Sequence, residues 1–186
     1  MSKTISVSRR ITPFQLIIMG FAGVILLGAL VLMLPLSARS GTVTPFGDAL
    51  FTATSAVCVT GLVVQDTASY WSGFGQAVIL LLIQIGGLGV ITVAASFALL
   101  SGRKISLMQR SAMQEAIAAP QMGGIVRLTG FILRMTLTIE IIGALVMLPV
   151  FCHDYGARGA WMAVFHSISA FCNAGFDLMG TQEAPY

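Results

Sequence analysis

Residues 49–62 read ALFTATSAVCVTGL, and residues 163–176, which lie 114 positions later, read AVFHSISAFCNAGF. The two stretches agree at six of 14 positions, whereas chance in such a biased composition would give roughly one or two matches. The matching pairs are Ala49/Ala163, Phe51/Phe165, Ser55/Ser169, Ala56/Ala170, Cys58/Cys172 and Gly61/Gly175. The preceding apolar segments agree as well, because Met33-Leu34-Pro35 recurs as Met147-Leu148-Pro149. An internal repeat, made of an apolar segment and the loop that follows it, is therefore predicted.

The composition of the chain indicates that this repeat lies in lipid. Of the 186 residues, 56% are hydrophobic and only 9% are charged, whereas soluble domains carry about 25% charged residues. The net charge is +3, but the basic residues do not gather with aromatic residues in one patch, so no nucleic-acid partner is expected. Three cysteines, an odd number, do not resemble a disulfide framework or a paired-cysteine zinc module.

Three apolar segments are long enough to cross the membrane as helices, which takes about 20 residues. They are residues 14–36, about 75–100 and about 125–151. The first is too long for the apolar region of a cleaved signal peptide, so we interpret it as an anchor. Another apolar segment starts at Pro45, with Thr44 as its expected cap, and is too short to cross. The sequence thus predicts an all-α polytopic membrane protein built from units of helix, re-entrant half-helix with a filter loop, and helix.

The distribution of lysine and arginine predicts the orientation of these segments. One side would carry seven basic residues and the other only Arg39 and Arg158, so the N-terminus is predicted to be cytoplasmic in a multi-pass protein of the plasma or inner membrane. The predicted order is a cytoplasmic N-terminus (1–13), a first repeat (14–100), a cytoplasmic amphipathic connector (101–124) and a second repeat (125–186) without its last helix. The seven basic residues are Lys3, Arg9, Arg10, Arg103, Lys104, Arg110 and Arg127.

The segments that follow the two half-helices are the candidate ion-binding residues. A helix that stops inside the bilayer directs the negative end of its dipole at a place where a cation is stabilised. Non-helical backbone at that depth is tolerated where it is buried in protein or lines a water-filled path, and its carbonyl oxygens can replace the hydration shell of an ion. The predicted ligands are backbone carbonyls of Val59, Thr60, Gly61, Asn173, Ala174 and Gly175. The competing interpretation is a pair of external loops packed on the helix ends.

These motifs resemble the potassium-transporter superfamily of Ktr, Trk and plant HKT proteins, and the membrane subunit of bacterial Ktr systems in particular. The residues that carry the resemblance are Thr54–Leu62, Gln84–Gly89 and Phe171–Phe176. The resemblance implies a potassium-channel-like fold with four repeats around one pore, in which Gly61 and Gly175 occupy the filter positions. It also implies a homodimer and a cytosolic nucleotide-binding regulatory subunit. Because a second helix of the second repeat would begin near residue 189, the chain is expected to be the N-terminal part of a longer protein.

The predicted function is that of a pore-forming subunit of a potassium uptake system, with potassium as substrate and no cofactor in this chain. Sodium as a coupling or activating ion is left open. The alternatives are a sodium-selective or poorly selective cation transporter of the same fold, or a non-transporting membrane scaffold. The predicted spans offer only Arg127, Arg134 and Glu140 as charged groups and no catalytic set, so an enzyme is not expected. No metal site is expected beyond the transported cation, because the spacing of Cys152, His153, His166 and Cys172 matches no tight zinc-ligand pattern.

The charged residues and the small residues of the predicted spans can be explained by structural roles as well as by functional ones. Arg134 and Glu140 are candidates for an intramembrane ion pair or for gating, and each is expected to pair with another helix. Gly86, Gly87 and Gly89 are expected to let their helix approach a neighbour or a filter loop closely. Cys58 and Cys172 are expected to pack as small apolar residues behind the filter. Thr52 and His166, which occupy equivalent positions in the two half-helices, are expected to be hydrogen-bonding wall residues.

Overall fold

The computed structural model describes residues 12–89, 92–93, 107–116 and 125–180 of the chain. Its helices are α1 (Pro13–Leu32), α2 (Phe46–Val57), α3 (Gly73–Leu88), α5 (Leu107–Ala116), α6 (Ile125–Tyr155) and α7 (Arg158–Phe171). Within this described part, the extended pairing is limited to one antiparallel bridge between Ala38 and Trp71. The helical fold expected from the sequence is therefore observed.

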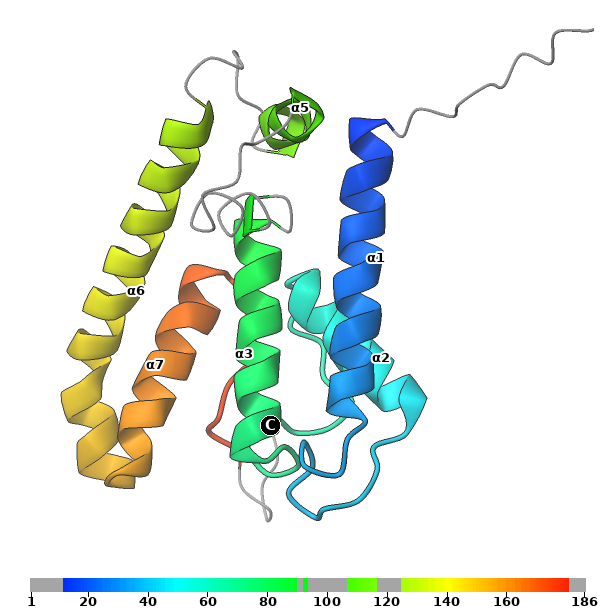
Figure 1. Ribbon diagram of the computed structural model, residues 1–186. Helices are drawn as coiled ribbons and strands as arrows, with labels where there is room; N and C mark the ends of the chain where they lie inside the picture. Colours follow the sequence, from blue (N-terminus) through cyan, green and yellow to red (C-terminus); the bar gives the residue numbers. More distant parts are fainter. Residues whose placement is uncertain (1–11, 90–91, 94–106, 117–124, 181–186) are drawn as a thin grey trace, which may run out of the picture.

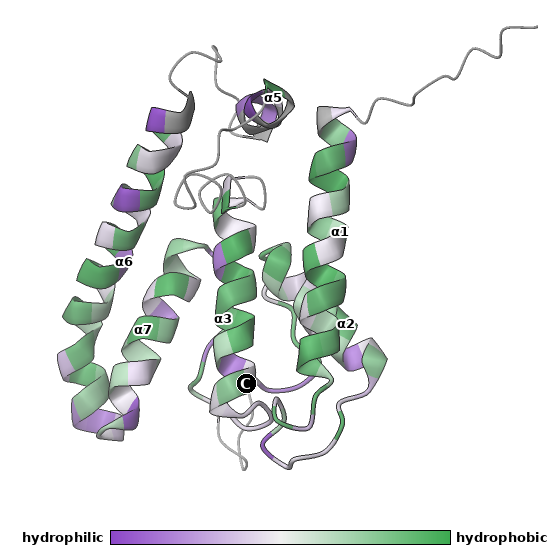
Figure 2. Cartoon of the chain, in the orientation of Figure 1, coloured by the Kyte–Doolittle hydropathy of each residue, from purple (hydrophilic) through white to green (hydrophobic). Residues whose placement is uncertain are grey.

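Two of the helices are long and apolar enough to cross a membrane. One is Phe14–Leu32 in α1 and the other is Arg127–Tyr155 in α6. Helix α1 begins with a capping box, in which Thr12 and Gln15 each bond the backbone of the other, followed by Pro13 at the first helical position. Figure 2 shows hydrophobic residues along most of α1 and along the half of α6 that ends near α7. Such exposed apolar surface is what lipid contact requires.

Two short helices run beside the long ones and end at mid-height. Figure 1 shows that α2 lies beside α1 and α3, that α7 lies beside α6 and α3, and that the chain turns back after each of them. The segments that follow, from residue 58 to 72 and from residue 172 to 180, return toward the end of the bundle where α2 and α7 begin. This is the helix, half-length helix and return expected for both units.

The helix expected over residues 75–100 ends earlier than predicted. Helix α3 ends at Leu88, and Gly89 follows it with a φ of +82°. Glycine takes a positive φ without steric cost, so the chain can leave the helix at this position. As a result α3 has 16 residues. Residues 92–93 are again helical, and residues 90–91 and 94–100, which were expected to belong to this helix, lie outside the described part of the chain.

The start of α2 also differs from the prediction by one residue. Pro45 itself occupies the cap position, and no side chain caps the helix. Thr44, expected as the cap, is instead buried and accepts a hydrogen bond from the Tyr70 hydroxyl at 3.2 Å. Asp48 is in the first turn as expected, where its carboxylate complements the helix dipole.

The core lies where α1, α2 and α3 meet, next to the start of α7. Trp71, Ile79, Ile83 and Phe165 are fully buried there. Helix α5 contacts α1 and α6 at the end of the bundle opposite the starts of α2 and α7 (Figure 1). Of the predicted connector, only this helix is described, and the rest of residues 101–124 lies outside the described part of the chain.

Candidate ion-conducting site

The segments after α2 and α7 have nearly the same backbone conformation. We call residues 59–62 the first loop and residues 173–176 the second loop. Val59 and Asn173 both have a φ of +57°, and two residues later Gly61 and Gly175 have φ values of +74° and +73°. Glycine adopts this left-handed region freely, whereas a β-branched residue such as Val59 does so at a cost of about 1–3 kcal/mol. Because such strain gathers at functional sites, Val59 marks the first loop as a candidate.

Equivalent hydrogen bonds hold both loops against their helices. The amide of Thr60 donates to the Ser55 carbonyl at 3.0 Å, and the amide of Ala174 donates to the Ser169 carbonyl at 2.7 Å. One residue earlier, the Val59 amide donates to the Ala56 carbonyl and the Asn173 amide to the Ala170 carbonyl. These bonds occupy the first two amides of each loop and two carbonyls in the last turn of each helix. The two loops therefore share backbone conformation, backbone hydrogen bonding and the glycine at their third position.

The two loops meet at their glycines. A Cβ atom added to Gly61 would lie 2.8 Å from the carbonyl oxygen of Ala174 and 3.1 Å from the Cα of Gly175. In the other direction, a Cβ atom added to Gly175 would lie 3.1 Å from the Cα of Gly61. The 2.8 Å contact is too short for a side chain at Gly61, and the two contacts of 3.1 Å would require the neighbouring backbone to shift. The sequence-matched glycines are thus brought together from parts of the chain 114 residues apart, and an oxygen of the second loop faces the first.

Helix α3 supports both loops through two successive glycines. A Cβ atom on Gly86 would collide with the backbone of Val57 at the end of α2, and one on Gly87 would lie 2.6 Å from the sulfur of Cys172. The close approach expected for this glycine cluster is therefore observed, with one glycine under each unit. Of the two cysteines expected to pack behind the loops, Cys172 does so, whereas Cys58 is exposed in the described structure.

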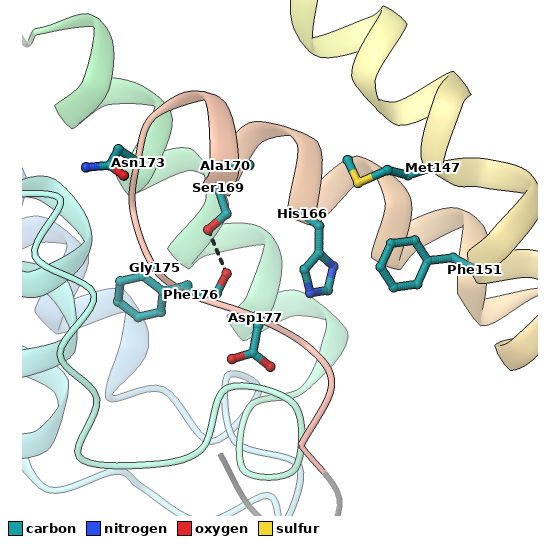
Figure 3. Close-up of a pocket in the computed structure, with 9 residues that line it drawn as sticks. All are labelled: Met147, Phe151, His166, Ser169, Ala170, Asn173, Gly175, Phe176 and Asp177. Atoms are coloured by element: carbon teal, nitrogen blue, oxygen red, sulfur yellow. Dashed lines mark hydrogen bonds between the residues drawn. The ribbon is translucent and has the colours of Figure 1, made fainter.

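A serine hydroxyl behind each loop bonds a different partner in the two units. The Ser55 hydroxyl is hydrogen bonded to the Thr60 hydroxyl at 2.9 Å. The Ser169 hydroxyl donates to the backbone carbonyl oxygen of Phe176 at 2.6 Å (Figure 3). Both serines are buried. Sequence reasoning matched the two serines but assigned them no role, and the pairing of Thr60 with Ala174 across the repeat is the signal that could have distinguished them.

A cavity of about 510 Å³ lies beside the second loop, lined by residues of α6, α7 and the loop itself (Figure 3). His166 lies in its wall with its ring stacked on Phe151 at 4.9 Å between centroids. The Nδ1 atom of His166 is 2.8 Å from the Met162 carbonyl, and its Nε2 accepts a hydrogen bond from the Leu178 amide at 3.3 Å. His166 is therefore a hydrogen-bonding wall residue as predicted. Thr52, its counterpart, is not, since its buried hydroxyl has no partner in the described structure.

The intramembrane charges lie apart from each other. Glu140 is 5% exposed and accepts a hydrogen bond from the Gln84 side chain of α3 at 2.9 Å. Its backbone carbonyl accepts the Ser167 hydroxyl at 2.6 Å. Arg134 is on an exposed face of α6, and the ion pairs found among the described residues include neither Arg134 nor Glu140. Glu140 thus contacts another helix as expected, but its partner is a neutral amide, which sequence reasoning did not anticipate.

A second polar link joins the two units nearer to the start of α3. The buried side chain of Gln76 donates to the carbonyls of Thr67 and Trp71 and accepts a hydrogen bond from the Trp161 indole of α7 at 3.0 Å. Gln76 and Gln84 are eight residues apart, which places them on one face of α3, and both bond the second unit. The glutamines were visible in the sequence as polar residues in an apolar segment, which is the signal for such links.

Comparison with known proteins adds the family to this geometry. Residues 5–184 match the family model described as TrkH, a cation transport protein. The chain belongs to this family. It is 46% identical over 175 residues to the potassium/sodium uptake protein NtpJ of Enterococcus hirae, covering 94% of this chain and 39% of that protein. It is 45% identical over 172 residues to the Ktr system potassium uptake protein B of Bacillus subtilis, covering 91% of this chain and 38% of that protein.

A third relative extends this similarity to another genus. The chain is 40% identical over 165 residues to the Ktr system potassium uptake protein B of Vibrio alginolyticus, covering 88% of this chain and 36% of that protein. The chain therefore spans less than two fifths of the length of each of these relatives. Family membership and the two long apolar helices together identify a membrane protein of the cation transport class. The resemblance to the Ktr and Trk proteins inferred from the sequence is confirmed.

Proposed function

We propose that this chain contributes two of the carbonyl loops of a potassium uptake pore. The single observation that carries the proposal is the contact of the first and second loops at Gly61 and Gly175, each with a left-handed backbone. Backbone carbonyls of Val59–Gly61 and Asn173–Gly175 replace the hydration shell of the ion. The C-terminal ends of α2 and α7, which precede these loops, add a partial negative charge that stabilises a cation.

The proposed pore also implies an orientation of the helices in the membrane. The end of the bundle that carries α5 faces the cytoplasm, and α2 and α7 enter the membrane from the opposite side as re-entrant half-helices. The relatives named as parts of Ktr systems support assembly with a regulatory subunit. We propose a cytosolic nucleotide-binding subunit as this partner and a homodimer as the membrane unit, with lipid around α1 and α6.

The sodium alternative has one specific observation in its favour. The Enterococcus hirae relative is named as a potassium/sodium uptake protein. Rings of carbonyls do not by themselves fix the preference between the two ions. We therefore propose potassium as the principal substrate and treat sodium passage as a measured outcome of the test below.

The test is uptake of rubidium and sodium by the complete gene product that contains residues 1–186, in cells that lack their own potassium uptake. We expect Gly61→Ser to reduce rubidium uptake, or its preference over sodium, at least about tenfold, because the added Cβ meets a carbonyl and the left-handed backbone is strained. Gly41→Ser is the matched control, since Gly41 has a φ of +69° and open space around its Cβ position. Rubidium uptake equally indifferent to both changes would place the ion path elsewhere, and sodium preferred over rubidium in the unmodified protein would favour the sodium alternative.

A further inference from the structure

The second loop ends in a carbonyl that is held by a side chain. The Ser169 hydroxyl donates to the Phe176 carbonyl oxygen at 2.6 Å, and Figure 3 shows this oxygen directed at α7. Ser169 is 3% exposed and Phe176 is 2% exposed, so water does not compete for this bond. A short, buried hydrogen bond of this kind fixes the orientation of the peptide that follows Gly175.

A single difference between the units accounts for this bond. In the first unit, Ser55 is hydrogen bonded to the hydroxyl of Thr60. The position equivalent to Thr60 in the second unit is Ala174, which has no hydroxyl. A buried serine hydroxyl needs a partner, and Ser169 finds it in the Phe176 carbonyl. The replacement of threonine by alanine thus transfers the bond from a side chain to the backbone of the second loop.

The held carbonyl lies immediately after the predicted ion ligands. Ala174, whose carbonyl oxygen faces Gly61, and the exposed Gly175 precede it directly. The number of carbonyl dipoles around an ion and their freedom to move are among the factors that decide which ion is preferred. A peptide that is free to rotate after Gly175 would change both.

We propose that Ser169 is a positioning residue that sets ion preference, because its hydroxyl holds the Phe176 carbonyl away from the ion path and ends the row of ion-facing carbonyls at Gly175. This inference rests on the proposed carbonyl filter and deepens it. The two loops have the same backbone conformation, but only the second has a backbone carbonyl held by its serine side chain. It also predicts that loss of the hydroxyl changes selectivity more than the rate of transport.

The test compares Ser169→Ala with Ser55→Ala in the uptake assay described above, with membrane abundance measured for each protein. We expect Ser169→Ala to change the ratio of rubidium to sodium uptake about fivefold, the effect of one lost hydrogen bond. Ser55→Ala, which removes a bond between two side chains, is expected to change the ratio less than about twofold. Ser169→Thr, which keeps the hydroxyl, is expected to restore the ratio.

Several outcomes would overturn the proposal. A Ser169→Ala protein at normal abundance with an unchanged ratio would do so, and so would equal changes from Ser169→Ala and Ser55→Ala. If Ser169→Ala does not accumulate, Ser169→Cys provides a group of similar size and weak donor strength, and an unchanged ratio in that protein would overturn it equally. Loss of uptake in Gly61→Ser, together with an indifferent Ser169→Ala, would reject this inference and leave the proposed function standing.

Discussion

The first and second loops have the same backbone but different side-chain bonding. Their φ values agree at both left-handed positions, +57° and +57°, then +74° and +73°. Their serines nevertheless bond different groups, the Thr60 hydroxyl in one unit and the Phe176 carbonyl in the other. The conformation thus depends on the glycines and on amides bonded to the helix ends, which both units share. The two units therefore have the same loop conformation and differ in the hydrogen bonds of the side chains behind the loops.

The same contrast holds for the glycines of α3 beneath the loops. Gly86 lies against the backbone of Val57, which cannot move without the end of α2. Gly87 lies against the side chain of Cys172. One helix therefore supports the first unit through rigid backbone and the second through a thiol that another residue can replace. The first prediction uses this difference.

We expect Gly86→Val to have the largest effect among the changes considered in this comparison. An added Cβ would lie 2.8 Å from the Val57 carbonyl carbon and still closer to its oxygen, so α2 or α3 must shift. Overpacking of this kind costs about 1–3 kcal/mol or more. Uptake of rubidium is expected to fall at least tenfold, which corresponds to about 1.4 kcal/mol. Thermal stability of the purified complete protein, measured alongside uptake, should fall as well.

The matched change at the second unit is Gly87→Ala. Its Cβ would lie 2.6 Å from the Cys172 sulfur, and removal of that sulfur by Cys172→Ala is expected to recover most of the lost uptake. No second-site change at Val57 can rescue Gly86→Val in this way, because the obstructing atoms belong to the backbone. Equal tolerance of Gly86→Val and Gly87→Ala would contradict the close contacts described for α3.

Much of this arrangement was predictable because it depends on local patterns. The long apolar segments predicted α1 and α6, and the matched Gly61 and Gly175 predicted two equivalent loops. Glycines in the middle of an apolar helix predicted the close approach of α3. Each of these features needs only the residue types within one segment and the physics of backbone in lipid.

Other features depend on which segments meet in space, and these the sequence did not reveal. The partner of Glu140 is Gln84, 56 residues away, and nothing in either segment identifies the other. The cap at α2 was misassigned because Thr44 had two possible roles, and the Tyr70 hydroxyl competes for its side chain. The early end of α3 was missed because apolar length was weighed above Gly89, whose φ of +82° terminates the helix.

The link between Gln84 and Glu140 offers a second test of how the units are joined. The Gln84 amide nitrogen donates to Glu140, while its carbonyl oxygen is buried and has no partner in the described structure. Glu140→Gln supplies a second amide, which can accept from Gln84 and donate to this oxygen. It also removes a buried charge. We expect Glu140→Gln to raise the thermal midpoint of the complete protein.

Glu140→Leu is the contrasting change, since it leaves the Gln84 amide buried and unpaired at a cost of about 1–3 kcal/mol. We expect it to lower the midpoint, and the double change Gln84→Leu with Glu140→Leu to recover part of the loss. A Glu140→Gln protein less stable than the unmodified protein would show that the charge itself is required. That result would return Glu140 to the role of an ion-pair or gating residue.

The smallest expected effect concerns the link between Trp161 and Gln76. Trp161→Phe keeps an aromatic ring beside Phe165 but removes the indole donor that lies 3.0 Å from the Gln76 side-chain oxygen. Loss of one such bond costs about 1 kcal/mol, so the thermal midpoint of the complete protein is expected to fall slightly. The ratio of rubidium to sodium uptake should stay within about twofold, because Gln76 bonds Thr67 and Trp71 rather than either loop. A large change in ion preference from Trp161→Phe would mean that preference depends on how the two units are docked, and not on the groups directly behind each loop.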